Sequence, residues 1–157
     1  MTRAILTASR FDMIERLLMA LWIGGLCIVG YLVAPILFTT LEDRQLAGML
    51  AGKLFSAISW IGLVIGVTLT VTCLVTEGSA WLRQWRAWAM VAILAIVVSM
   101  LFVVQPMMAD LKSQGPAIPG SDLAAAFGRL HGISSGLYLV MSLLGLALVA
   151  LGLRRRS

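Results

Sequence analysis

One histidine and two adjacent methionines are the residues of this 157-residue chain whose types best suit metal chemistry. His131 stands in "FGRLHGISSG" just before a long apolar run, and Met107 and Met108 end the preceding run in "VVQPMM". Methionine thioethers together with an imidazole suit Cu(I). We therefore expect copper to be the cofactor that these residues could hold, although adjacent methionines point to different faces of a helix.

His131 has two other roles open to it on sequence grounds. An imidazole titrates near neutral pH and could gate or couple protons. It could also donate a hydrogen bond to a carbonyl or carboxylate and so fix the entrance of the last apolar run, since polar groups in membrane segments usually find partners. The sequence leaves the metal, protonic and structural roles open.

Enzymatic catalysis needs a nucleophile with a base, paired acids or a metal. The four long apolar runs contain no Asp, Glu, Lys or Arg, so we expect no enzyme. The basic residues flank these runs in short clusters, which is typical of topology signals rather than of a nucleic-acid partner. Cys27 and Cys73 fall about 10 Å apart in depth, which predicts two free thiols.

The elements that must position these residues are four apolar runs, at about 17–38, 54–76, 87–108 and 130–153. Hydrophobic residues make up 61% of the chain and charged residues 12%. A run of ~20 apolar residues crosses a bilayer, and only helices satisfy the backbone of such a segment in lipid. The sequence predicts one all-α domain over residues 1–157, a four-transmembrane-helix bundle whose second and fourth helices extend beyond the membrane on the outer side.

Charge sets the predicted orientation. One side holds Arg3, Arg10, Arg16, Arg83, Arg86, Arg154, Arg155 and Arg156, and the other holds Arg44, Lys53, Lys112 and Arg129. The richer side is cytoplasmic in membrane proteins, which predicts a multi-pass protein of a bacterial-type inner membrane with both termini in the cytoplasm. Trp81, Trp85 and Trp88 then fall in the interfacial aromatic belt.

Several outer residues are expected to converge on a shallow pocket. Helical spacing places Phe127, His131, Ser135, Tyr138 and Ser142 on one face of the last helix, which we expect to face the bundle interior. Pro35 and Pro106 bend the first and third helices and would free the carbonyls of Tyr31 and Phe102. The predicted pocket comprises Pro35, Phe38, Gln105, Pro106, Phe127, His131, Ser134, Ser135 and Tyr138.

Glycines at helical spacing indicate close helix packing. They are Gly24 and Gly25 in the first helix, Gly62 and Gly66 in the second, and Gly128, Gly132 and Gly136 in the fourth. These surfaces either close the bundle or dock a partner. Besides the lipid bilayer, the expected partners are a second copy of the chain or a larger membrane complex.

The segments "LWIGGLCIVGYLVAPILFTTL", "AGMLAGKLF", "VVQPMMADL" and "FGRLHGISS" resemble the transmembrane protein 205-like family, a membrane domain of unknown function, over roughly residues 17 to 136. That family is more distantly similar to the copper-resistance D domain. The resemblance implies a four-helix membrane domain. From the residues of the outer pocket, with His131 at its centre, we expect transport or handling of a small solute or a copper-like metal ion. The alternative is a structural or accessory subunit that docks a larger membrane complex through its glycine-rich helix faces.

Overall fold

The computed structural model describes residues 2–115 and 120–153, with side chains from residue 13 onward. The chain forms α1 (Thr2–Ile28), a π-helical segment η1 (Val29–Val33), α2 (Ala34–Thr40), α3 (Arg44–Glu77), a 3₁₀ segment η2 (Gly78–Arg83), α4 (Trp85–Ser99), a second π-helical segment η3 (Met100–Val104), α5 (Gln105–Ser113) and α6 (Asp122–Leu151). Over these residues there is no β-strand.

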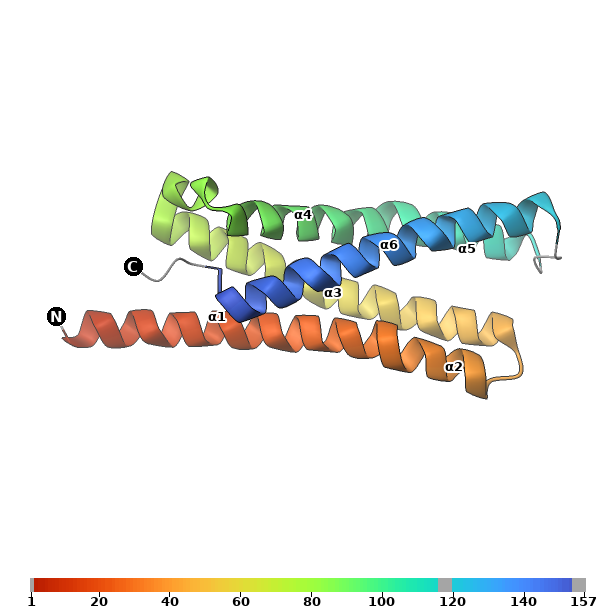
Figure 1. The fold of residues 1–157 in the computed structure, drawn as a ribbon, viewed down its shortest axis with the longest axis horizontal. Coiled ribbons are helices and arrows are strands. Elements are labelled where there is room, and N and C mark those ends of the chain that lie inside the picture. Colours follow the sequence, from red (N-terminus) through yellow and green to blue (C-terminus); the bar gives the residue numbers. More distant parts are fainter. Residues whose placement is uncertain (1, 116–119, 154–157) are drawn as a thin grey trace.

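The helices join into four long rods that run back and forth in chain order (Figure 1). Each rod is long and apolar enough to cross a membrane: Met13–Thr40, Arg44–Arg83, Trp85–Ser113 and Asp122–Leu151. This confirms the predicted all-α, four-helix class and indicates a multi-pass membrane protein. The charge count behind the predicted orientation includes Arg154, Arg155 and Arg156 and the side chains of Arg3 and Arg10, which lie outside the described residues.

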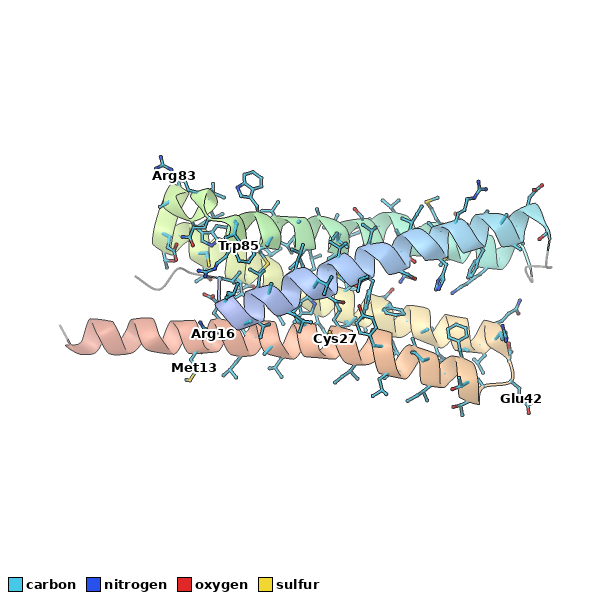
Figure 2. All side chains as sticks on the ribbon, viewed as in Figure 1. Met13, Arg16, Cys27, Glu42, Arg83 and Trp85 are labelled. Atoms are coloured by element: carbon cyan, nitrogen blue, oxygen red, sulfur yellow. The ribbon has the colours of Figure 1, made fainter. Side chains whose placement is uncertain are left out.

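The bundle has two ends. At the termini end, the start of the first rod lies beside the end of α6, and Arg16 and Arg83 lie near this end (Figure 2). At the loop end, α2 turns into α3 near Glu42, and α5 is followed by α6 (Figures 1 and 2). Cys27 lies near the middle of the length, in the apolar part of the bundle (Figure 2).

The two returning helices are longer than a membrane requires. The 34 residues of α3 and the 30 residues of α6 span ~51 Å and ~45 Å, against a hydrocarbon core of ~30 Å. Both helices start with side-chain caps. Asp43 accepts hydrogen bonds from the backbone N–H groups of Gln45 and Leu46, and Ser121 accepts one from Ala124.

The buried core lies mainly between the termini end and the middle of the bundle. Its largest members are Met19, Trp22, Ile23, Leu26, Trp81, Met90, Ile93, Met141, Leu148 and Leu153. Cys73 belongs to this core, Cys27 packs against it, and both are free thiols as predicted. In contrast, α2 and α5 at the loop end contain no buried residue.

Two side chains tie the helices together at the termini end, both by hydrogen bonds to the backbone of Leu153. The buried Glu15 carboxylate accepts a hydrogen bond from the backbone N–H of Leu153 at 2.9 Å, and the indole N–H of Trp81 donates to the Leu153 carbonyl at 3.3 Å. Trp81 is 0% exposed, so its predicted place in the interfacial belt is wrong. The reason is that η2 folds this indole inward onto the end of α6, whereas Trp85 and Trp88 remain exposed.

Candidate functional site

The polar face predicted for the last helix divides into two parts. Tyr138 is half-buried and Ser142 is buried, whereas His131 and Ser135 are exposed. The expectation that the whole stripe faces the bundle interior is therefore wrong for its outer half. The reason is that α6 crosses the bundle obliquely, from beside α1 at the termini end toward α5 at the loop end (Figure 1).

His131 lies in the loop-end half of α6. It lies 20 residues from Leu151, or ~30 Å along the helix, which is about the thickness of a hydrocarbon core. Its ring stacks on Phe127 at a centroid distance of 6.2 Å and an interplanar angle of 4°. The Ser134 hydroxyl donates to the His131 carbonyl at 2.8 Å, so its hydrogen-bond partner is a backbone carbonyl of the same helix. The imidazole is thus a surface group at the predicted interfacial depth.

Tyr138 anchors α6 to α1 at the middle of the bundle. Its hydroxyl donates to the Leu26 carbonyl, and its ring meets Phe55 edge to face at 5.2 Å. A Cβ on Gly30 would lie 2.3 Å from the Tyr138 ring, so the ring fits only because residue 30 has no side chain. Nearby, the Tyr31 hydroxyl donates to Ser142 at 3.1 Å. The Tyr138 hydroxyl, which was expected to line a pocket, is engaged here in holding two helices together.

Both prolines follow π-helical segments. The N–H of Ala34 bonds to the carbonyl of Val29, five residues back, immediately before Pro35. The N–H of Gln105 bonds to the carbonyl of Met100 immediately before Pro106. In this wider register the carbonyl opposite each proline ring is that of residue 30 or 101. The prediction that the Tyr31 and Phe102 carbonyls are freed assumed an α-helical register up to each proline, where the structure has a π-helical segment.

At the loop end, α5 lies against a small-residue face of α3. The Lys112 ammonium donates to the Gly48 carbonyl at 3.0 Å. The Lys112 nitrogen and the Gln105 side-chain oxygen lie 3.9 Å and 3.8 Å from the position of a Cβ on Gly52. Phe38 reaches the same face, 3.8 Å from a Cβ position on Gly48. We call Lys112, Gln105, Phe38, Gly48 and Gly52 the loop-end cluster.

Sequence reasoning included Gln105 and Phe38 in the site but treated Lys112 only as an outer charge. The available signal was the four-residue spacing of Gly48 and Gly52, which opens a helix face to a long side chain.

The structure does not bring all the predicted pocket residues to one point. Pro35, Pro106 and Met107 are exposed, and Met108 is half-buried. No side-chain hydrogen bond or ring contact in the described part of the chain joins His131 to Gln105, to Tyr138 or to either methionine. The residues 2–115 and 120–153 also contain no group of three or more His, Cys, Asp or Glu side chains that could hold a metal ion.

The glycines predicted to pack helices behave in two ways. A Cβ on Gly62 or Gly66 would collide with Trp22 or Leu94, and one on Gly25 would press on Ile58 at 3.0 Å. Gly145, which the sequence reading did not single out, makes room for Ile23 in the same manner. In contrast, a Cβ would meet nothing within 4 Å at Gly24, Gly128, Gly132 and Gly136. Gly128, Gly132 and Gly136 of α6 therefore form an open ladder within this chain.

Comparison with known proteins gives one assignment. A family model described as a domain of unknown function, DUF4149, matches residues 17–117. No curated protein and no solved structure matches the chain. The match shows no link to the transmembrane protein 205-like or copper-resistance D families. Because it covers well over half of the chain, including the first three membrane-spanning rods, the chain belongs to the DUF4149 family.

Proposed function

We propose that this chain is an accessory membrane protein that pairs the loop-end half of α6 with a transmembrane helix of another subunit. The observation that carries the proposal is the difference between its glycines. Those at positions 62, 66 and 145 are filled by side chains of this chain, whereas those at 128, 132 and 136 lie exposed with nothing within 4 Å of a Cβ position. Glycines at every fourth position allow two helix backbones to approach closely in a membrane.

The polar neighbours of this ladder support the same proposal independently. His131 and Ser135 are exposed on α6, although polar side chains in membrane segments usually face the protein interior. His131 and Ser135 lie four residues apart on one flank of the ladder, so a helix laid along the ladder would lie beside both. The first occupant to test is a second copy of this chain, because a two-fold interface uses the same surface on both subunits and needs no other partner.

Oligomeric state in lipid nanodiscs, measured by native mass spectrometry, tests this proposal. A leucine at position 132 would fill the ladder, so Gly132→Leu should convert a dimer to a monomer. Gly24→Leu is the matched control, because Gly24 is also open but lies on α1. Loss of a co-purifying membrane protein in Gly132→Leu alone would support docking to a larger complex. A wild-type monomer without a partner, or equal behaviour of both variants, would overturn the proposal.

A second candidate function is the transport or handling of a small solute or a metal ion at the loop end. The supporting observation is that the Lys112 ammonium and the Gln105 amide both reach Gly52, so a donor and an acceptor come together beside a helix face without side chains. A copper site would have to draw on His131, Met107 and Met108. Titration of the purified protein with Cu(I), beside His131→Ala, tests the metal version. Binding of about one ion per chain that is lost in the variant would support it, and no binding in either protein would exclude it.

A further inference from the structure

Each of the two rods that run from the termini end to the loop end contains a π-helical segment, whereas the two returning helices, α3 and α6, contain none. The first rod is interrupted by η1 and the third by η3, whereas α3 and α6 run without a break. In both interrupted rods a proline stands second after the π-helical segment, Pro35 in one and Pro106 in the other. Since proline has no N–H, each rod lacks a hydrogen bond at this place, and such sites are where helices bend.

Packing changes at the same two places. On the termini side, α1 and α4 contribute fully buried residues, among them Trp22, Leu26, Ile93 and Val97. Beyond the prolines, α2 and α5 have no buried residue, and the buried positions of α6 begin only at Met141. Segments with few buried contacts are the parts of a protein that open at low free-energy cost.

α2 packs along α3, whereas α5 packs against α6 and reaches α3 through a side chain. α5 is tied by the hydrogen bond between Lys112 and the Gly48 carbonyl, and α2 rests on Gly48 through Phe38. The first turns of α3, in contrast, are capped by Asp43 and include the buried Ala47 and Ala51. The structure thus combines two end segments without buried residues, α2 and α5, with a capped central helix that has buried residues at the same end.

We infer that α2 and α5 are hinged arms that swing about η1 and η3 and uncover the face of α3 at Gly48 and Gly52. Opening breaks the Lys112 hydrogen bond and separates Lys112 and Gln105 from Gly52. Closing restores the loop-end cluster. The inference concerns α2 and α5 and does not depend on what, if anything, covers α6.

Hydrogen–deuterium exchange on the full chain in nanodiscs tests this inference. Amides of residues 36–40 and 107–113 should exchange faster than those of residues 47–53 in α3, which lie at the same end of the bundle. The double variant Pro35→Ala, Pro106→Ala restores two backbone donors, so exchange in both arms should slow by about tenfold or more. Thr72→Val, in the termini half of α3, is the control and should leave both arms unchanged.

A second variant separates the arms from general fraying of helix ends. Lys112→Met removes the hydrogen bond from the Lys112 ammonium to the Gly48 carbonyl, so it should accelerate exchange in α5 and leave α3 unchanged. Equal exchange in the arms and in α3, or arms that respond to neither variant, would overturn the hinge.

Discussion

The indole of Trp22 lies directly over Gly62. A Cβ on Gly62 would stand 2.0 Å from the indole nitrogen, which is far inside any contact distance. Trp22 is 1% exposed and is among the largest side chains of the core, so the close approach of α1 and α3 depends on the absence of a side chain at residue 62. The GxxxG spacing in α3 thus makes room for Trp22 and Leu94 of this chain rather than for the backbone of a second helix.

Gly62→Ala should lower the free energy of unfolding by about 1–3 kcal/mol, the usual cost of overpacking a core. Alanine is otherwise the better helix former by about 1 kcal/mol, so the sign of the change identifies the collision with Trp22. Gly24→Ala supplies the control, because its Cβ meets nothing within 4 Å and the variant should be at least as stable as wild type. The measurement is chemical denaturation in detergent micelles. Equal stability of the two variants would contradict the packing described at Gly62.

Tyr138 offers a second prediction, at the junction of α1 and α6. Tyr138→Phe removes the hydrogen bond to the Leu26 carbonyl and keeps the ring, so it should cost about 0.5–1.5 kcal/mol. Gly30→Ala should cost more, because its methyl group collides with the ring itself. Ser135→Ala is the control on the same helix, since Ser135 is exposed. Thermal unfolding followed by circular dichroism gives the ranking, and a Gly30→Ala protein as stable as Ser135→Ala would argue against this junction.

The four spans could be predicted from the sequence because a bilayer imposes one length and one composition on any helix that crosses it. The full lengths of α3 and α6 could not be obtained from apolar runs alone, because both helices continue through polar residues at the loop end. Helical period also placed His131 and Tyr138 on one face correctly. The helical period does not predict the angle at which α6 crosses the bundle. Because of that angle, His131 is exposed while Tyr138 is half-buried against the other helices.

Two other features depend on contacts between distant segments. Trp81 stands among arginines and tryptophans as interfacial residues do, but its hydrogen bond to Leu153, 72 residues away, makes it a core residue. Lys112 carries no local sign of its role, since its acceptor is a backbone carbonyl of α3. Gly48 and Gly52 gave the only hint, and a small-residue spacing does not say which side chain fills it.

Trp81 therefore carries a third prediction. Trp81→Phe keeps most of the buried apolar volume but leaves the Leu153 carbonyl without its indole donor, so the protein should lose about 1–3 kcal/mol of stability. Trp85→Phe makes the same chemical change at a neighbouring position. Because Trp85 is exposed, this variant should unfold at the same temperature as the wild-type protein. Differential scanning fluorimetry in the same detergent compares the pair. A larger loss of stability in Trp85→Phe than in Trp81→Phe would contradict the placement of Trp81 in the core and of Trp85 on the surface.

The exposure of His131 leads to the last prediction. His131→Ala removes a side chain whose one described ring contact is Phe127 on the same helix, so stability should change by no more than about 0.5 kcal/mol. Because folding is preserved, any accompanying loss of Cu(I) binding, of dimer formation or of a cellular phenotype would report a direct role of the imidazole. A drop of about 1–3 kcal/mol would instead mean that the imidazole holds a buried partner, as the structural role considered from the sequence requires. Phe127→Leu removes the stacked ring and keeps the imidazole. If the stack between the two rings is what matters, Phe127→Leu and His131→Ala should lose the same function; if the imidazole acts by itself, only His131→Ala should lose it.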